Sequence, residues 1–442
     1  MTRRQRSARD VALDVLLAVE LDDAYANLAL SQELAGSADP REAALATELV
    51  FGTLRLRGRY DVVLGECSSR PLVDVDPVTR NALRLGAHQI LTLVVADYAA
   101  VSATVDQVKR RRGPGAGKFA NAVLRAVARQ SWEQWRDRIV GTRDGVAAQE
   151  FEWSHPAWII RALRESLARA GAETELTELL QRNDEPAPVT LGARRMTRSA
   201  LLAASGGREG DWSPWAVRVS GDPGRFGAVR SGAAGVQDEG SQLMALAVTR
   251  LETPAGNWLD LCAGPGGKTA DLAGPAAEAG SRLIAVEQHR HRADLVRAAT
   301  AGGAPVEVIT ADATTAPLPD AARILLDAPC TGLGAVRRRP ELRWRRQPGD
   351  LPELRALQTA LLDRALDLLV PGGCVAYVTC SPHLAETDQI VRAALSRHAG
   401  VRTIPAGPLL PEVADAAVGD YVQLWPHRHD TDGMFLAVLQ RQ

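Results

Sequence analysis

Two cysteines in the C-terminal half stand in sequence contexts that suit covalent chemistry. Cys330 closes the run Asp327-Ala-Pro-Cys, and Cys380 lies in the run Thr379-Cys-Ser-Pro. Each run follows a short apolar stretch typical of a β-strand, so both cysteines are expected at the carboxyl edge of one sheet, where ligands bind. A thiolate is a strong nucleophile, and its pKa, about 8.5 when free, can be lowered locally. These two cysteines are therefore the candidate catalytic residues.

A thiolate at such an edge suits attack on a pyrimidine base. C5 of cytosine is a poor nucleophile, but a thiolate that adds to C6 makes C5 enamine-like and able to accept a methyl group. A base then removes the C5 proton and the thiolate leaves. Asp327 is the candidate carboxyl group for stabilising charge beside N3 or the exocyclic amine. The residue types alone do not indicate which cysteine attacks.

A glycine-rich turn in the same half is the candidate cofactor site. After Asp260 it runs through Cys262, Ala263, Gly264, Pro265, Gly266, Gly267 and Lys268. Glycines let the backbone approach a ligand closely, and the helix that follows offers free N–H groups to a carboxylate. The turn matches neither the GxGxxG dinucleotide pattern nor a Walker phosphate loop. S-adenosylmethionine is therefore favoured over a dinucleotide or a nucleoside triphosphate.

Acidic residues at successive strand ends extend this site. Glu287 ends the second predicted strand, where a carboxylate can accept hydrogen bonds from ribose hydroxyls. Asp312 closes the third predicted strand and could reach an adenine amine. Together with Asp260, these residues indicate a nucleoside pocket.

The other cysteines are interpreted as structural. Cys67 lies in a helical region, Cys374 lies inside an apolar strand and the thiol of Cys262 lies within the turn. An isolated cysteine is most often simply a buried side chain. Five scattered cysteines do not form a disulfide framework, so we expect free thiols in a reducing compartment.

The hydrophobic patterns around these motifs predict a multi-domain chain. Residues 1–140 have helical periodicity throughout and are expected to form an all-α domain. Residues 141–235 are expected to form a small α/β connecting subdomain. Residues 236–442 alternate short strands with helices, which predicts a parallel sheet with helices on both faces.

Individual elements are also predicted. The predicted helices include 44–56, 78–93, 159–180 and 353–370. The predicted strands are 258–262, 283–287, 306–310, 324–327 and 374–379.

Composition places the chain among soluble globular proteins. The 442 residues are 46% apolar and 24% charged, with a net charge of −1. No apolar run approaches the ~20 residues that span a bilayer. A basic N-terminus precedes an apolar stretch, but Asp14 interrupts it, and Val11, Val15 and Ala18 fit a helix face rather than a secretory signal. We expect a cytoplasmic monomer with no membrane contact and no metal ion.

The ordered motifs resemble those of the RsmB/Sun group of the Nop/Sun family of RNA cytosine-5 methyltransferases. In the C-terminal half the matching segments are Val236 to Leu243, Asp260 to Thr269, Asp327 to Gly334, Arg338 to Arg346, Thr379 to Ser381 and Asp432 to Phe435. The N-terminal part resembles the NusB RNA-binding fold through Leu49 to Arg55, Leu83 to Ala87 and Lys118 to Arg125. The resemblance spans nearly the whole chain.

The resemblance implies a fold, a cofactor and residue roles. The C-terminal domain would be a Rossmann-like class I methyltransferase domain, with residues 262–268 holding the methionine part of S-adenosylmethionine. Glu287 would bind the ribose, and Asp312 and Asp327 would complete the pocket. Cys380 would be the nucleophile, and Cys330 would help release the methylated product. The implied substrate is 16S ribosomal RNA of the small subunit, with transfer RNA as the alternative.

Basic segments are candidate RNA contacts. Residues 337–346 hold six arginines with Trp344 among them, and would grip the RNA backbone near a cytosine flipped out of its stack. The basic edge at residues 109–118 could contact phosphates. The stretch after Cys380 departs from the usual Glu-Asn of the family, so Glu386 receives no role here.

Two other function classes fit the residues less well. An RNA-binding assembly or antitermination factor would keep the NusB-like domain and carry a vestigial methylase, but both cysteines, Asp327 and the full turn are retained. A nicotinamide-dependent oxidoreductase does not fit the turn and leaves the cysteines unexplained.

Overall fold

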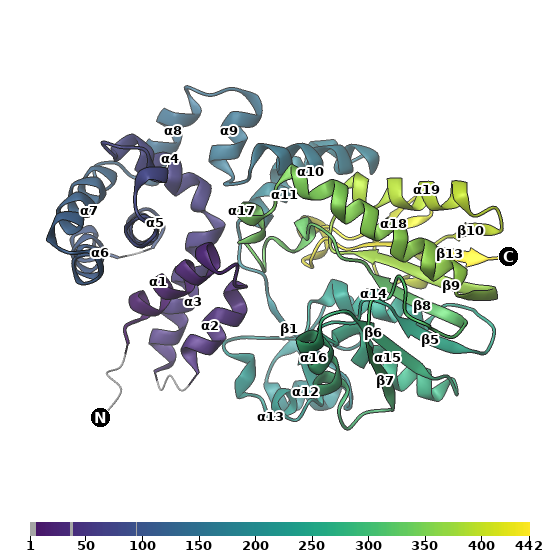
Figure 1. The fold of residues 1–442 in the computed structure, drawn as a ribbon. Helices are drawn as coiled ribbons and strands as arrows, with labels where there is room; N and C mark the ends of the chain where they lie inside the picture. Colours follow the sequence, from purple (N-terminus) through teal and green to yellow (C-terminus); the bar gives the residue numbers. More distant parts are fainter. Residues whose placement is uncertain (1–5, 36–38, 94) are drawn as a thin grey trace. The chain divides into compact units, whose positions relative to one another are not determined.

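The computed structural model describes residues 6–35, 39–93 and 95–442. The chain divides into two compact units, which Figure 1 colours along the sequence. The first unit contains Met1–Arg161 together with Arg339–Arg345, and the second contains Ala162–Arg338 and Arg346–Gln442. The predicted three-part division at residues 140 and 235 stays a prediction.

The first unit is helical, as predicted. Its helices are α1 (Ala8–Leu21), α2 (Ala26–Leu34), α3 (Pro40–Arg55), α4 (Arg57–Cys67), η1 (Leu72–Asp74), α5 (Pro77–Leu91), α6 (Asp97–Arg112), α7 (Pro114–Val127), α8 (Trp132–Val140), α9 (Gly145–Glu152) and α17 (Leu342–Arg345). The predicted helices 44–56 and 78–93 are confirmed as α3 and α5, but both begin earlier. Asp39 and Asp76 cap these helices through side-chain hydrogen bonds, and a proline follows each of them in the first turn.

The predicted helix 159–180 is wrong as a single element. The structure has α10 (Ala157–Arg169), η2 (Glu173–Glu175) and α11 (Leu176–Asn183). Gly171 adopts a φ of +70°, a left-handed conformation that glycine adopts without a steric cost and that stops the helix. Apolar periodicity on both sides of the break conceals it in the sequence.

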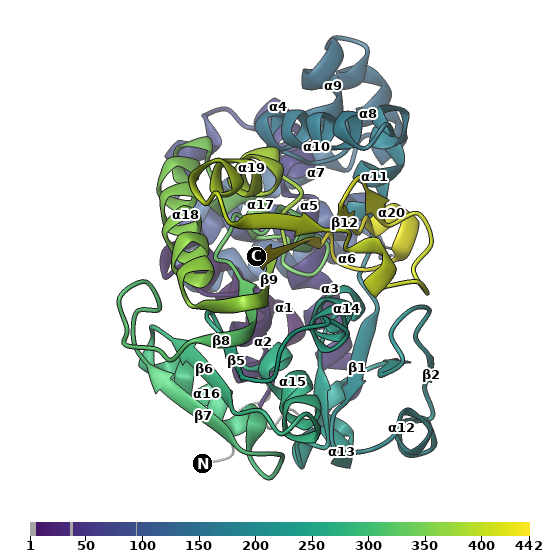
Figure 2. The ribbon, with the colours of Figure 1, turned by 90° about the vertical axis from the view of Figure 1, so that its right-hand side faces the viewer.

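A small antiparallel sheet follows in the second unit, in the order β2-β3-β1-β4. Its elements are β1 (Val189–Ala193), α12 (Arg198–Ser205), β2 (Arg208–Glu209), β3 (Ala216–Val219), η3 (Pro223–Arg225), α13 (Gly227–Arg230) and β4 (Ala234–Val236). Leu191, Leu201, Val217 and Phe226 form its buried core. Figure 2 shows β1 and β2 with α12 and α13 close by.

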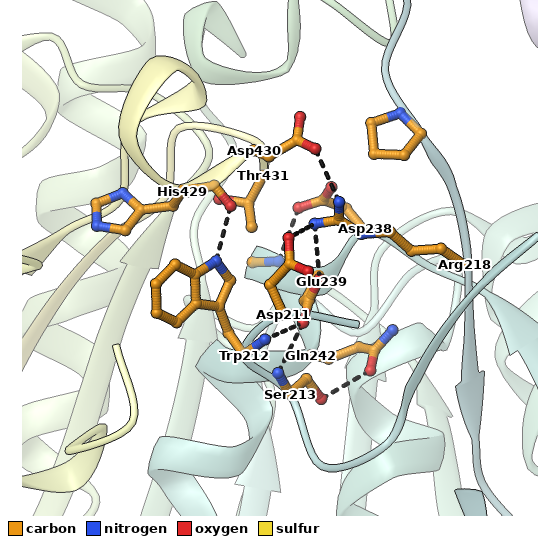
Figure 3. A network of polar contacts seen from close by, with 12 residues as sticks. Asp211, Trp212, Ser213, Arg218, Asp238, Glu239, Gln242, His429, Asp430 and Thr431 are labelled. Atoms are coloured by element: carbon orange, nitrogen blue, oxygen red, sulfur yellow. Dashed lines mark hydrogen bonds and ion pairs between the residues drawn. The ribbon is translucent and has the colours of Figure 1, made fainter. Parts of the chain in front are cut away.

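A polar network joins this small sheet to the N-terminus of α14 (Glu239–Thr249) and to the segment at residues 429–432, which begins at the last residue of α20 (Figure 3). The buried guanidinium of Arg218 binds Glu239 at 3.2 Å and Asp430 at 2.8 Å. Glu239 also accepts hydrogen bonds from the backbone N–H groups of Trp212 and Ser213, at 2.5 and 2.8 Å. Because each charge is paired and hydrogen-bonded, the buried ions are compensated.

The main sheet has the predicted doubly wound form. Its strands are β5 (Asn257–Asp260), β6 (Leu283–Glu287), β7 (Val306–Thr310), β8 (Ala321–Asp327), β9 (Leu369–Thr379), β10 (Val401–Ile404), β11 (Ala417–Val418), β12 (Tyr421–Gln423) and β13 (Phe435–Arg441). They run in the order β11-β12-β13-β9-β8-β5-β6-β7, with β10 beside β13. The pairs from β9 to β7 are parallel, and β13 is antiparallel to β9.

Helices cover both faces of this sheet. On one face α14, α15 (Gly267–Glu278) and α16 (Arg290–Thr300) pack, and on the other face α18 (Leu351–Asp367) and α19 (Asp388–Arg397) pack. Strand β8 serves both cores, because Leu325 faces α14 and α15 while Ile324 and Leu326 face α18 and α19. The predicted helix 353–370 is too long, since β9 begins at Leu369.

Shorter elements complete the second unit. They are η4 (Leu333–Ala335), η5 (Pro348–Asp350), η6 (Leu384–Glu386), η7 (Gly407–Leu409) and α20 (Pro426–His429). Across the part of the chain that the structure describes, no helix combines the length and the apolar character needed to cross a membrane.

Removing one ion pair of the second unit is expected to weaken it in a pH-dependent way. Glu175 accepts hydrogen bonds from Arg428 at 2.6 and 2.7 Å, and these bonds lower its pKa from 4.5 to about 2. The pair therefore stabilises the fold fully above pH 4.5 and loses its contribution as the pH falls towards 2. We expect Glu175→Gln to lower the free energy of unfolding by about 1 kcal/mol at pH 7.

Thermal unfolding of wild type and variant between pH 7 and pH 3 tests this prediction. The two Tm values should converge as the pH falls below about 4.5. An equal difference at every pH would show that the charge of Glu175 is not the source of the stability.

Candidate active site

The predicted site residues gather where parallel strands end. Asp260 ends β5, Glu287 ends β6 and Asp327 ends β8. Cys380 follows the last residue of β9, and Cys330 lies in the loop after β8. Since the carboxyl ends of parallel strands lie at the same edge of a sheet, the fold brings these residues to one edge.

The two cysteines face one another at this edge. Their Sγ atoms lie 3.4 Å apart, and both residues are partly exposed free thiols. Two backbone hydrogen bonds tie the loops together, from Gly334 N to Cys380 O and from Ala328 N to Val378 O, both at 2.9 Å. The catalytic pair expected from sequence is thus a contact pair in the structure.

The surroundings of the two thiols differ. The hydrogen bond to Cys380, burial and the negative charges of Cys380, Glu386 and Asp327 raise the pKa of Cys330 well above its ordinary value. Either sulfur can be the donor in their 3.4 Å contact, and Cys330 is a thiol whose ionisation its surroundings oppose.

A lysine from the glycine-rich turn adds positive charge beside the thiols. Lys268 Nζ lies 2.7 Å from Asp327 Oδ2. Although burial lowers the pKa of Lys268, the charges of Asp327 and of Cys380 raise it overall. The ammonium group thus holds Asp327 in place and favours a negative charge on Cys380.

The first strand contributes a buried carboxyl group. Asp260 is 1% exposed and accepts a hydrogen bond from Thr269 Oγ1 at 2.7 Å. Burial is the main reason that its pKa is raised to about 7, and this bond opposes the rise. Asp260 therefore stabilises the turn by holding Thr269, in the first turn of α15, through this hydrogen bond.

At two positions of the glycine-rich turn there is no room for a side chain. Gly266 has a φ of +102°, and a Cβ there would come within 2.8 Å of Val296 Cα. A Cβ on Gly264 would come within 2.3 Å of Glu287 Oε2. Glycine at these two positions therefore lets the turn pack closely against α16 and the Glu287 side chain.

The acidic residues around the turn suit an adenosyl ligand. Glu287 accepts hydrogen bonds from Gly264 N at 3.1 Å and His289 N at 2.9 Å, which orients its carboxylate beside the turn. Asp312 lies two residues beyond the end of β7, exposed, and binds Thr314 N and Oγ1 at 2.9 and 2.7 Å. Carboxylates accept hydrogen bonds from ribose hydroxyls and from an adenine amine, so this set fits S-adenosylmethionine.

The structure also places the turn's remaining residues. Cys262, Ala263 and Pro265 lie between Asp260 and Gly266, and Gly267 begins α15. Burial is the main cause that raises the pKa of the Cys262 thiol well above its ordinary value, which agrees with a structural thiol. The roles of all these residues in cofactor binding remain predictions.

The expectation that residues 337–346 grip RNA is wrong for two of the arginines. Arg337 is 2% exposed and binds Asp430 Oδ1 at 3.0 Å. Arg343 is fully buried and donates to the backbone carbonyls of Arg55 and Ser154, at 3.1 and 3.2 Å. Guanidinium groups that are themselves buried and hydrogen-bonded cannot contact a phosphate, so these arginines stabilise the fold.

The basic edge at residues 109–118 is exposed but paired. Arg110, Arg111 and Arg112 of α6 lie 3.1, 2.8 and 3.1 Å from carboxylates of α1 and of the loop before α5. Exposed ion pairs of this kind are weak, and a phosphate can compete for the same guanidinium groups. Its contact with RNA stays a prediction.

Sequence reasoning missed Glu386, which lies six residues beyond Cys380. It is fully buried and is bound by residues adjacent to both cysteines. An acidic residue between Ala385 and Thr387 does not by itself indicate such a role, since two of its partners, Thr331 and Gln358, lie 55 and 28 residues away in the sequence.

Comparison with protein families identifies both halves of the chain. The family described as 16S rRNA methyltransferase RsmB/F matches residues 244–440, and the NusB family matches residues 6–129. Among solved structures, that of PH0851 has a TM-score of 0.82 and covers 99% of each chain at 21% identity. NSun6 from Pyrococcus horikoshii has a TM-score of 0.52 at 18% identity and covers 63% of this chain and 97% of its own. These structures confirm the predicted fold class.

Sequence relatives extend over almost the whole chain. Ribosomal RNA small subunit methyltransferase B of Pseudomonas putida is 32% identical and covers 90% of each chain. The Bacillus subtilis protein described as the probable enzyme of the same name is 30% identical and covers 99% of this chain and 100% of its own. A Mycobacterium tuberculosis protein, described as a methyltransferase whose activity is not established, is 47% identical and covers 98% of this chain and 96% of its own.

Proposed function

Because the chain belongs to the RsmB/F family of 16S rRNA methyltransferases and is an S-adenosylmethionine-dependent RNA methyltransferase, we propose that it methylates C5 of a cytosine. The reaction proceeds through a covalent bond between Cys380 Sγ and C6 of the base. The observation that carries this proposal is the 3.4 Å contact between the two thiols, beside the ion pair of Lys268 and Asp327.

Cys380 begins the reaction. Its thiolate adds to C6, and the electron pair of the C5–C6 double bond moves to C5, where conjugation through C4 to N3 spreads the charge. This electron pair then forms the bond from C5 to the methyl group that the cofactor supplies. Asp327 accepts a hydrogen bond from the exocyclic amine and orients the base, while Lys268 holds that carboxylate at 2.7 Å. The positive charge of Lys268 also favours the thiolate form of Cys380 before the attack.

Cys330 ends the reaction. After methylation the C5 proton must leave, so that the electron pair of the C5–H bond restores the double bond and the C6–Sγ bond breaks. Cys330 lies 3.4 Å from Cys380 Sγ, where it can promote proton removal and departure of Cys380.

The cofactor S-adenosylmethionine supplies the methyl group when it is bound. Residues 262–268 would hold its methionine part, through backbone N–H groups at the start of α15. Glu287 would bind the ribose hydroxyls, and Asp312 and Asp327 would complete the pocket.

The proposed substrate is 16S ribosomal RNA, which the names of the relatives support. Transfer RNA is the alternative with the same chemistry. The monomeric state, the absence of a metal ion and the cytoplasmic location also stay predictions.

Identification of the methylated product tests the proposal. The protein is incubated with S-adenosylmethionine and 16S ribosomal RNA or transfer RNA carrying tritium at C5 of cytosine. We expect tritium release equal to methyl transfer, 5-methylcytidine in the nuclease digest, and a preference for the ribosomal RNA. Methylation without tritium release would overturn the C5 assignment, and preference for transfer RNA would overturn the substrate. A protein that binds RNA and transfers no methyl group would indicate a vestigial methylase.

A further inference from the structure

Glu386 is a buried carboxylate beneath the cysteine pair. It ends η6 (Leu384–Glu386) and is 0% exposed. The contacts of its side chain are hydrogen bonds from neutral groups, and no ion pair involves it among the described residues. A buried carboxylate is costly unless hydrogen bonds compensate its charge, so these bonds determine how the loops around it pack.

Four donors converge on this carboxylate. Oε1 accepts from Thr331 N at 2.8 Å and from Gln358 Nε2 at 3.2 Å. Oε2 accepts from Thr331 Oγ1 at 2.5 Å and from Ser381 Oγ at 2.7 Å. An ionised carboxylate offers about four acceptor positions, so its hydrogen-bonding capacity is filled.

The donors are neighbours of the two thiols. Thr331 directly follows Cys330, and Ser381 directly follows Cys380. Gln358 also donates to the carbonyl of Pro329 at 2.8 Å, on the other side of Cys330. Glu386 therefore anchors the residue after each cysteine directly, and Gln358, which it also binds, anchors the residue before Cys330.

Glu386 is itself held in place. The hydroxyl group of Tyr377, inside β9, donates to the backbone carbonyl of Glu386 at 2.7 Å. The side chain of Tyr377 is buried between the sheet and the helices on that face. The anchor is thus built on a strand of the sheet, which gives it a rigid base.

We infer that Glu386 is a positioning residue, which holds Cys330 and Cys380 at the separation that the reaction requires. The inference rests on the proposed function for its catalytic consequence. Glu386 acts through Thr331 and Ser381 and does not touch the reacting atoms. Misplacement of a reacting group by about 1 Å can cost roughly 100-fold in rate, so loss of the anchor should reduce turnover without weakening substrate binding.

Glu386→Gln is the sharpest variant, because it keeps the shape of the side chain. An amide has one oxygen, which can still accept from Thr331 N and Gln358 Nε2, while its NH2 group would face the hydroxyl groups of Thr331 and Ser381. Those two hydroxyl groups must then turn and accept, so two hydrogen bonds to a charged oxygen are replaced by weaker neutral ones. Glu386→Asp keeps the charge but shortens the side chain by one methylene, and should retain part of the activity.

The first measurement is independent of methylation. Diamide oxidises two neighbouring thiols to a disulfide by taking up two electrons and two protons, and peptide mass spectrometry follows the Cys330–Cys380 disulfide in the full-length protein. We expect Glu386→Gln to form it at least about tenfold more slowly than wild type, because the thiols meet less often. Glu239→Gln is the matched control: Glu239 is also a buried carboxylate of the second unit, and it binds no residue next to a cysteine. Its variant should form the disulfide at the wild-type rate.

The second measurement is steady-state methylation by the same variants. For Glu386→Gln we expect kcat to fall roughly 100-fold, with KM for RNA and Kd for S-adenosylmethionine within about twofold of wild type. Glu386→Asp should lie between the two proteins. A folded Glu386→Gln protein with unchanged kcat, or with an unchanged rate of disulfide formation, would overturn the inference. If the disulfide forms more slowly but wild type releases no tritium from C5, the proposed function fails and the positioning of the thiols stands.

Discussion

Replacement of Cys380 by alanine is expected to abolish both methyl transfer and the covalent complex with RNA. Without the thiolate no group adds to C6, and C5 stays too weak a nucleophile to accept a methyl group. We expect kcat/KM to fall by about 10⁴-fold or more. Losses of this size are seen when the nucleophile is removed from a set of catalytic residues that act together. Binding of S-adenosylmethionine should persist, since the turn and Glu287 are untouched.

Incubation with methyl-labelled S-adenosylmethionine and 16S ribosomal RNA, followed by denaturing gels, measures both outcomes. Cys374→Ala is the matched control, because Cys374 lies inside β9, the strand that Cys380 directly follows. It is fully buried, and burial is the main cause that raises its pKa to about 11. It should keep wild-type activity and lose about 1 kcal/mol of stability from the small cavity. Product formation by Cys380→Ala at a rate near wild type would refute its role as the nucleophile.

Cys330→Ala is expected to accumulate a protein–RNA adduct that survives denaturation. The attack by Cys380 does not need the second thiol, but removal of the C5 proton and departure of Cys380 do. Multiple turnover should fall by about 10²-fold to 10⁴-fold, the usual contribution of a general acid or base. Because release follows methylation, the trapped adduct should carry the labelled methyl group.

The double variant Cys330→Ala/Cys380→Ala controls this experiment and should form no adduct. An adduct without the methyl label would place Cys330 before methyl transfer instead of after it. Adduct formation by Cys380→Ala and none by Cys330→Ala would reverse the two roles.

Regular elements of the fold were predictable where local pattern and tertiary packing agree. The strands at 283–287 and 306–310 match β6 and β7 in both bounds, because short apolar runs with charged or small residues on each side specify them locally. The predicted helix 353–370 ran into β9, since the leucines and valine at 368–370 suit a buried helix face and a buried strand equally. Gly171 indicates a break in the helix predicted at 159–180, but the apolar periodicity on both sides of it favoured one continuous helix.

Side-chain partners were predictable only when a motif implied them. The turn at 262–268 and the cysteine runs indicated a site, because their residue types carry chemistry wherever they lie. The basic stretch at 337–346 suggested RNA contacts, yet Arg343 binds carbonyls 288 and 189 positions away. The presence of an arginine in a sequence does not reveal whether its guanidinium group will bind a buried acceptor in the folded protein.

The sequence by itself determined the chemistry available to this protein, through two cysteines at strand ends, an acidic residue before one of them and a cofactor turn. It also indicated that these residues belong to an α/β domain that follows a helical domain along the chain. Tertiary structure decided how these groups act on one another. The hydrogen bond to Cys380 and burial raise the pKa of Cys330, with the negative charges of Glu386 and Asp327 adding to the rise, while Lys268 places positive charge near Cys380. Glu386 acquires its place only when the loops after β8 and β9 fold over it, since its donors lie as far as 55 residues away. Electrostatic and hydrogen-bond energies depend on distance and burial, and those arise only in the folded chain.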